Sequence, residues 1–110
     1  MSDLIYLASP YSHQNAGVRF ERFRMACEAA GRLIKEGHSV ISPIAHSHPI
    51  ATICGLPLTW HAWQMQDVAI LSKCDEVVVL RLDGWEDSKG IKAELTYAHN
   101  MGIPIRYIDP

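Results

Sequence analysis

Glu94 has the clearest potential for chemistry in this chain, because its position conflicts with its charge. The segment 88–101 predicts a helix. At about 100° per residue, Glu94 falls roughly 60° from Ile91, within the apolar face of that helix. A glutamate is rarely placed among core positions without a partner or a purpose. The pattern therefore predicts a carboxylate that points into the protein.

The helix expected before it shows the same conflict at Asp67. That helix begins after Thr59, a plausible N-cap, and continues to about Lys73. Asp67 falls roughly 20° from Trp60, in the middle of the apolar face that also carries Trp63 and Leu71. In a partly dry cleft, desolvation and mutual repulsion would raise the pKa of at least one of the two carboxylates, as acid, base or nucleophile chemistry requires.

A structural alternative exists for each carboxylate taken alone. Each could cap backbone groups or form an ion pair with an arginine; the candidates are Arg19, Arg22 and Arg81. Two inward carboxylates, both close to predicted strand ends, favour a functional site over two separate structural roles.

The elements that must position these side chains alternate between strand and helix. The expected strands are 4–8, 39–42, 76–80 and 103–108, and the expected helices are about 16–36, 59–73 and 88–101. The segment 43–59 contains three prolines and a glycine, and predicts an irregular loop with at most one helical turn. This order predicts an α/β fold: a three-layer α/β/α, flavodoxin- or Rossmann-like parallel sheet of four to five strands.

In such sheets, ligands bind at the carboxyl ends of the strands. In this chain those ends carry polar, aromatic or glycine-containing segments; they are Ser9 to Tyr11, Pro43 to His48, and Asp83 to Ser88. The predicted site therefore lies where the fold would place it.

Length and composition limit the classes of function. The chain has 110 residues, which fits a single domain over 1–110. Hydrophobic residues make up 48% and charged residues 20%, so the chain is globular rather than disordered. A net charge of −2 gives no basic surface for a nucleic-acid polymer. No apolar run reaches the length of a membrane span, and Met1 to Asp3 lack a signal peptide's basic start, so we expect a cytoplasmic protein.

The three cysteines show no paired spacing, so we expect free thiols. Cys27 and Cys74 are expected to be buried as small apolar residues, because both fall on apolar helix faces. In the first helix, the face that carries Cys27 is shared by Phe23, Ala30 and Ile34.

Two stretches taken together, 67–80 and 88–98, resemble the nucleoside 2-deoxyribosyltransferase superfamily, which includes the 2'-deoxynucleoside 5'-phosphate N-hydrolases. The shared pattern is an aspartate, Asp67, eight residues before a second one, Asp75, that opens a buried strand. A serine-containing loop and a helix with a glutamate at Glu94 follow. Gly102 to Pro104 match the usual entry to the last strand, and Tyr6 matches an early tyrosine. Segments 84–88 and 47–49 look more similar to the small members of the group than to its proven transferases.

The resemblance implies a reaction and a set of roles. Glu94 would attack C1' of the sugar, and Asp67 would protonate or bind the departing base. Water then gives hydrolysis, whereas a second base gives transfer. Ser88 and the backbone amides of Lys89 and Gly90 could hold a 5'-phosphate or 5'-hydroxyl at the helix N-terminus. The alternative function is a non-catalytic nucleotide-binding module that kept the fold.

The remaining candidate contacts to substrate each have a structural alternative. Tyr6 could be a core aromatic residue, and Ser9 and Tyr11 could serve a turn instead of a sugar. Arg19 could reach a phosphate or pair with a carboxylate. Trp85 lies in a polar loop, which suggests contact with a ligand or another subunit.

His48 is expected to hydrogen-bond from a substrate loop. Together with His46 and His61 it raises the question of zinc, but no cysteine or carboxylate completes a recognisable spacing, so we expect no metal. Trp60 and Trp63 are expected to pack in the core rather than against a base.

No phosphate-binding or dinucleotide-binding glycine motif occurs, and we expect no cofactor. The expected partner is a small nucleoside or nucleotide. Because the resembling family often completes its site across a homodimer, we expect a homodimer or homotetramer.

Overall fold

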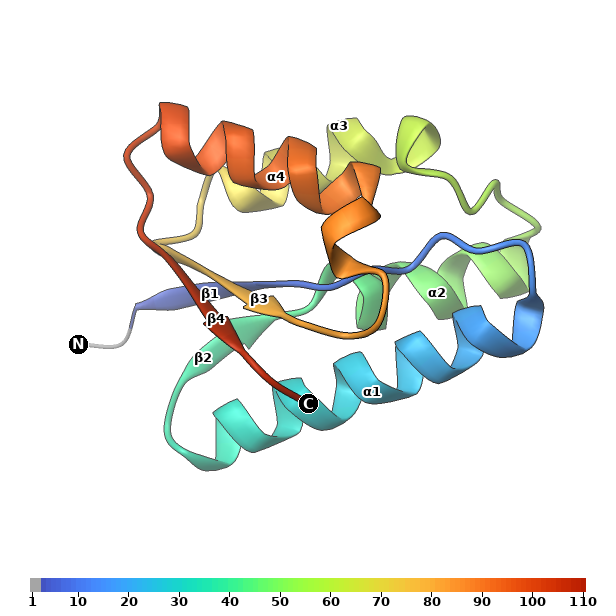
Figure 1. The fold of residues 1–110 in the computed structure, drawn as a ribbon, viewed down its shortest axis with the longest axis horizontal. Coiled ribbons are helices and arrows are strands. Elements are labelled where there is room, and N and C mark those ends of the chain that lie inside the picture. The colour runs from blue at the N-terminus through green and yellow to red at the C-terminus, as the bar shows by residue number, and fades with distance from the viewer. Residues whose placement is uncertain (1–2) are drawn as a thin grey trace.

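A parallel sheet of four strands forms the centre of the computed structural model, which describes residues 3–110. Met1 and Ser2, on which the interpretation of the N-terminus partly depends, lie outside the described residues. The strand order is β2-β1-β3-β4 (Figure 1). The strands are β1 Leu4–Ala8, β2 Ser39–Ile41, β3 Glu76–Leu80 and β4 Ile105–Ile108. This is the predicted α/β fold, with the last strand two residues shorter at its start than expected.

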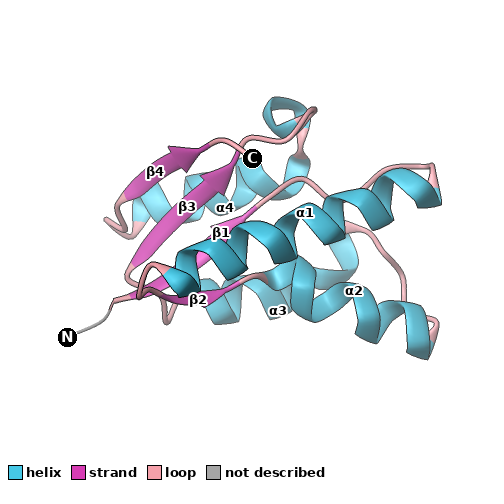
Figure 2. Cartoon of the chain, turned by 90° about the horizontal axis from the view of Figure 1, so that it is seen from below, coloured by secondary structure: helices cyan, strands magenta, loops and turns pink. Residues whose placement is uncertain are grey.

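Helices cover both faces of this sheet. The helices are α1 Ala16–Lys35, α2 Pro43–Cys54, α3 Trp60–Leu71 and α4 Lys89–Asn100, with a short 3-10 helix, η1, at Trp85–Asp87. Figure 2 shows α1 across one face and α3 and α4 behind the other. The three-layer arrangement is as predicted, because right-handed crossovers between parallel strands place successive helices on the two faces.

Alternation along β1 and β3 divides the core into two halves. Ile5 and Leu7 point to the α1 face and contact Val78 and Leu80 of β3. Tyr6 and Ala8 of β1 point to the opposite face, which α3 and α4 cover, and so do Val77 and Val79 of β3. The central strands are buried on both faces, which explains their continuous runs of apolar residues.

The segment 43–59 is the main departure from the predicted elements, because most of it is the helix α2 rather than a loop. Pro43 occupies the first turn, where the missing N–H costs no hydrogen bond. Ser42 caps the helix by accepting a hydrogen bond from the Ala45 amide at 3.2 Å. Gly55 ends it in the left-handed conformation, with φ of 67°. Pro43 and Gly55, which suggested a loop, thus lie at the two ends of a helix, whereas Pro49 lies inside it and Pro57 follows it.

The buried face of α1 also differs from the predicted one. Ala26, Ala29 and Leu33 are buried, whereas Cys27 is exposed and Ile34 is 56% exposed. Small residues let the helix lie close to the sheet, so the larger apolar side chains are turned to the side. The prediction of a buried Cys27 is wrong, and that of a buried Cys74 is confirmed.

Asp75 has a structural role in this fold. Its carboxylate accepts a hydrogen bond from the Leu4 amide at 2.8 Å, and its own amide donates to the Leu4 carbonyl at 2.8 Å. The second aspartate of the sequence pattern therefore joins the starts of β1 and β3. That junction sets the register in which Tyr6 pairs with Val77.

Candidate active site

A cavity of about 630 Å³ lies beyond the carboxyl ends of β1 and β3. Its wall is formed by the loop after β1, one face of α2, the start of α3, the loop after β3 and the first turns of α4. The chain leaves β1 toward β2 and later returns to β3 on the other side of β1. The cavity thus occupies the switch point at which open α/β sheets bind their ligands.

Glu94 lines this cavity and is only 5% exposed. It lies in the middle of α4, one turn after Ile91, which is buried against the sheet. The pKa of Glu94 is raised to about 8: burial raises it most, the hydrogen bond from Tyr6 lowers it, and the nearby charge of Asp67 raises it. The helix wheel therefore predicted its inward position correctly.

Asp67 lies in the same wall, on α3, and is 6% exposed. Its Oδ1 atom is buried and has no hydrogen-bond partner among the described residues. Burial raises the pKa of Asp67 to about 6. Neither carboxylate is paired with one of the suggested arginines. Arg19 and Arg22 donate to backbone carbonyls, and Arg81 pairs with Asp109.

Tyr6 connects the sheet to the Glu94 carboxylate. Its ring is fully buried in β1, and its hydroxyl donates a hydrogen bond to Glu94 Oε2. Burial and the charges of both carboxylates raise the pKa of the Tyr6 hydroxyl, so it stays a donor at any physiological pH. Tyr6 is not part of the cavity wall, so it reaches a ligand only through Glu94.

The N-terminus of α4 opens into the cavity through Ser88, Lys89 and Gly90. Ser88 is the N-cap, and its Oγ accepts a hydrogen bond from the Ile91 amide at 3.2 Å. The Ser88 hydroxyl proton is still available to a ligand. A Cβ atom on Gly90 would lie 3.3 Å from the Trp60 ring, so glycine allows α4 to pack closely on α3.

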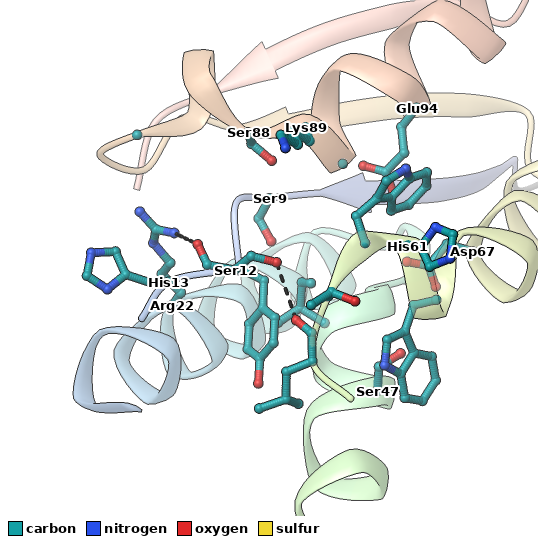
Figure 3. Close-up of a pocket in the computed structure, with 18 of the residues that line it drawn as sticks. Ser9, Ser12, His13, Arg22, Ser47, His61, Asp67, Ser88, Lys89 and Glu94 are labelled. Carbon is teal, nitrogen blue, oxygen red and sulfur yellow. Dashed lines mark hydrogen bonds between the residues drawn. The ribbon is translucent and has the colours of Figure 1, made fainter. Parts of the chain in front are cut away.

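Arg22 fixes the opposite side of the cavity. Its guanidinium donates to the Ser12 carbonyl at 2.9 Å (Figure 3). It also donates to the Asp83 carbonyl at 3.0 Å, so it joins the loops after β1 and β3. Gly84 has φ of 86°, and a Cβ atom there would lie 2.8 Å from Arg22 Nη2. Any larger residue would therefore displace the arginine.

Ser9 and Tyr11 of the predicted set also line the cavity, whereas Arg19, His48 and Trp85 do not. Arg19 contacts the backbone of the loop before α1, including the Gln14 carbonyl at 3.1 Å. Trp85 packs against the core near Tyr107, with ring centroids 5.6 Å apart.

His48 lies behind Tyr11 instead of facing the cavity. Its Nδ1 atom is 2.6 Å from the Tyr11 hydroxyl, and its ring stacks on Phe23 with centroids 4.2 Å apart. Burial lowers the pKa of His48, and the charge of Arg19 lowers it further. Burial also raises the pKa of Tyr11. Both shifts favour a neutral pair, in which the Tyr11 hydroxyl donates to the His48 nitrogen.

Several wall residues were not predicted as site residues. Trp60 and Trp63, expected in the core, are half-buried and line the cavity. The unpredicted polar wall residues include Ser12, His13, Arg22, Ser47, His61 and Asp87. A signal existed for those in segments 43–48 and 83–88, which the strand-end rule had marked.

Comparison with known proteins identifies the family. A family model described as a domain of unknown function, DUF1937, matches residues 3–109. The chain belongs to the DUF1937 family. Among curated protein sequences, none matches this DUF1937 domain significantly.

A solved structure shares the fold of the DUF1937 domain. It is a 2-deoxyribosyltransferase from the psychrotolerant bacterium Bacillus psychrosaccharolyticus, similar at a TM-score of 0.66 with 24% sequence identity. The match covers 97% of this chain and 72% of the transferase chain. At this identity the likeness establishes a common fold.

Two further observations concern metals and membranes. Within residues 3–110 of the DUF1937 domain, no group of three or more histidine, cysteine, aspartate or glutamate side chains has a geometry that could hold a metal ion. His46, His48 and His61 are therefore not brought together. None of the helices in this range is long and apolar enough to cross a membrane.

Proposed function

We propose that this protein cleaves or transfers the N-glycosidic bond of a 2'-deoxynucleoside or its 5'-monophosphate, with Glu94 as the nucleophile. The observation that carries the proposal is the pair of buried carboxylates, Glu94 and Asp67, in the wall of one cavity without an arginine partner. The sequence resemblance to the nucleoside 2-deoxyribosyltransferase superfamily supports it, and so does the fold shared with one such transferase.

The first step forms a covalent intermediate. The Glu94 carboxylate attacks C1' of the deoxyribose, and the electrons of the C1'–N bond move to the base nitrogen. Asp67 gives that nitrogen its proton, so the base leaves as a neutral molecule. The transition state resembles an oxocarbenium ion, which the carboxylate charge stabilises as in retaining glycoside hydrolysis.

The second step releases the sugar from Glu94. A water or a second base attacks C1', the bond between C1' and the glutamate oxygen breaks, and Asp67 takes the proton of the attacking group. Water gives free deoxyribose, or deoxyribose 5-phosphate from a monophosphate, and completes hydrolysis. A base instead gives a new nucleoside or nucleotide. The Tyr6 hydroxyl holds Glu94 Oε2, which leaves the other carboxylate oxygen for C1'.

The 5' end of the substrate is expected at the N-terminus of α4. The free backbone amides of the first turn and the helix dipole favour an anion there. Ser88 can donate its hydroxyl proton, and the Lys89 side chain adds a positive charge to the same wall. A 5'-phosphate would use all of these groups, and a 5'-hydroxyl only some.

Release of free base tests this function. Purified protein is incubated with the common 2'-deoxynucleosides and their 5'-monophosphates, with and without a second free base, and the products are separated by chromatography. Wild type is expected to release base or exchange it, and Glu94→Ala to do neither. Mass spectrometry with a 2'-fluoro-arabinonucleoside, which slows release of the intermediate, should find the sugar on the Glu94 peptide.

Glu28→Ala is the matched control, because Glu28 is an exposed glutamate on the outer side of α1 and pairs with Arg24. Its turnover should equal that of wild type. Base release that persists in Glu94→Ala would refute the assignment of the nucleophile. Ligand-induced thermal stabilisation without turnover on any substrate would instead favour the nucleotide-binding module.

We also propose that the chains associate as a homodimer or homotetramer. Ile53 is 83% exposed at the end of α2, and Met65 is 85% exposed on α3. Large exposed apolar side chains of this kind mark interaction surfaces when they gather. Light scattering coupled to size-exclusion chromatography would refute the proposal if it gave the monomer mass of 12.3 kDa at micromolar concentration.

A further inference from the structure

Three buried side-chain polar atoms have no hydrogen-bond partner within residues 3–110: Ser9 Oγ, Ser47 Oγ and Asp67 Oδ1. All three residues line the same cavity. Burying a polar atom without a partner destabilises a fold, so such atoms are rare and need an explanation. Their concentration in one wall indicates that a ligand supplies the missing partners.

Of these three residues, Asp67 takes part in the proposed chemistry and Ser9 was predicted to contact the sugar, whereas Ser47 has no assigned role. It lies on α2, the helix that replaced the expected loop, and with Ile44 it forms the side of that helix that lines the cavity. The helix is fixed at both ends by the Ser42 cap and by Gly55, and it packs against α1 and β1. A rigid element therefore holds the Ser47 hydroxyl in the wall.

The order of the polar side chains along the cavity indicates what Ser47 would contact. In the view of Figure 3, Glu94 lies above, Asp67 lies below it, and Ser47 lies lower still. Ser9, by contrast, lies between Ser88 and Ser12. If Glu94 faces C1' and Asp67 faces the base nitrogen that leaves, the rest of the base extends toward Ser47. The wall of the same cavity includes Trp63, an aromatic side chain suited to a flat ring.

We propose that Ser47 determines base specificity by hydrogen-bonding the exocyclic group on the edge of the base remote from the sugar. That group is the substituent at position 6 of a purine or position 4 of a pyrimidine. A serine hydroxyl can donate to a carbonyl or accept from an amino group, so Ser47 recognises the presence of a polar substituent there. This inference rests on the proposed function, because that function orients the base.

The test compares each accepted substrate with an analogue that lacks the exocyclic group. For a purine substrate the analogue is purine 2'-deoxyriboside, and for a pyrimidine it is the 2'-deoxyriboside of pyrimidin-2-one. Wild type should prefer the substituted substrate, and Ser47→Ala should lower its kcat/KM roughly threefold to tenfold, the worth of one neutral hydrogen bond. The kcat/KM for the unsubstituted analogue should stay the same, so the preference disappears.

Two matched serine-to-alanine variants complete the design. Ser9→Ala should lower kcat/KM equally for the substituted and unsubstituted substrates, because Ser9 lies on the sugar side of the cavity. Ser72→Ala should change neither, because the Ser72 hydroxyl is exposed at the end of α3 and donates to the Ala69 carbonyl at 2.7 Å. Thermal unfolding of each variant verifies that it is folded.

The outcomes separate this inference from the function it rests on. Equal losses on both members of a substrate pair, or no loss on either, would overturn the role of Ser47 while base release by wild type still supported the enzyme. If wild type releases no base, the proposed function fails. Calorimetric titration with the same nucleoside pairs then decides whether Ser47→Ala selectively weakens binding of the substituted member. Absence of that selective effect, or of any binding, overturns the inference as well.

Discussion

The two faces of the sheet are built from the same strands but have different contents. On the α1 face, Ile5 and Leu7 pack against Ala29 and Leu33, and this half of the core is apolar throughout the described residues. On the other face, the next residue of β1 along the chain, Tyr6, meets a buried glutamate. Both carboxylates of the second face line the cavity of about 630 Å³, to which α1 contributes Arg22.

This difference shows how a small α/β domain can separate stability from chemistry. Because strand side chains alternate between faces, neighbouring residues of β1 belong to different halves of the core. The apolar α1 face stabilises the fold without polar groups that need partners. The opposite face contains two carboxylates whose burial opposes folding at neutral pH, as their raised pKa values indicate.

One substitution on each face tests this comparison most directly. Glu94→Gln is expected to lower kcat by about 10⁴-fold or more, since loss of a nucleophile removes the covalent route. Leu33→Ala is expected to lower the free energy of unfolding by about 2–5 kcal/mol, as buried leucines do. Its kcat should stay within about twofold of wild type at a temperature where it is folded. Kinetics and urea unfolding on both variants measure this, and loss of kcat in folded Leu33→Ala would contradict the separation.

The stability of Glu94→Gln should depend on pH in a defined direction. Below pH 4.5 the carboxyl is protonated in both folded and unfolded chains. Between pH 4.5 and about 8 the unfolded chain releases a proton that the folded chain keeps, so wild-type stability falls as pH rises. Glutamine has no such proton. The variant should match wild type near pH 4 and exceed it by up to roughly 4 kcal/mol at pH 8 and above.

Urea unfolding from pH 4 to pH 9 measures this difference. Leu33→Ala serves as the control from the other face, because its loss of stability should be the same at every pH in this range. A difference between Glu94→Gln and wild type that did not grow with pH would show that Glu94 ionises in the folded protein as an exposed glutamate does.

Asp67→Asn is expected to lower kcat/KM by about 10² to 10³, within the usual contribution of a general acid. The active form has a protonated Asp67 and an ionised Glu94, so the pair holds one proton. A plot of wild-type kcat/KM against pH should therefore be bell-shaped, rising near pH 6 and falling near pH 8. Asparagine removes the group that must hold this proton. The fall at alkaline pH should therefore disappear, and activity should rise with pH to a plateau.

A substrate whose base leaves without protonation provides the control for Asp67. The base of 7-methyl-2'-deoxyguanosine carries a positive charge and departs as a neutral molecule. Asp67→Asn should cleave it at nearly the wild-type rate. An equal loss on this substrate and on 2'-deoxyguanosine would indicate that Asp67 positions the base instead of protonating it.

The inward carboxylates were predictable from the sequence, because each shares a helix face with an apolar residue of the core. Ile91 and Leu71 define those faces and are buried, so the positions of Glu94 and Asp67 follow from helix geometry. The same reasoning failed on α1, where Ala26 is buried and Ile34 is exposed. A helical wheel assigns the buried face from the large apolar side chains. On α1, however, the small side chains Ala26 and Ala29 face the sheet, because they allow the helix to pack closely against it.

The parts of the site that the sequence did not predict depend on tertiary contacts. Trp60 and Trp63 are large and apolar, so the sequence predicted that they pack in the core. Whether such a side chain contacts other side chains or lines a cavity depends on the tertiary fold. Ser47 was not predicted as a site residue, because the prolines on either side of it, Pro43 and Pro49, indicated an irregular loop. His48, predicted to contact substrate, instead contacts Tyr11 and Phe23, because α2 places it toward α1.

The substitution with the smallest expected effect tests whether Tyr6 of the sheet sets the pKa of Glu94. The Tyr6 hydroxyl lowers the pKa of Glu94 by donating to its carboxylate, so Tyr6→Phe should raise that pKa further. A smaller share of the protein would then hold its single proton on Asp67, and kcat/KM between pH 6 and pH 8 should fall roughly tenfold. The alkaline fall should move to higher pH, and the loss should narrow above it, where Glu94 is ionised in both proteins. In the Asp67→Asn background the rising limb should also move to higher pH. A loss that was equal at every pH would mean that Tyr6 only supports the position of α4, and the two faces of β1 would then differ in packing alone.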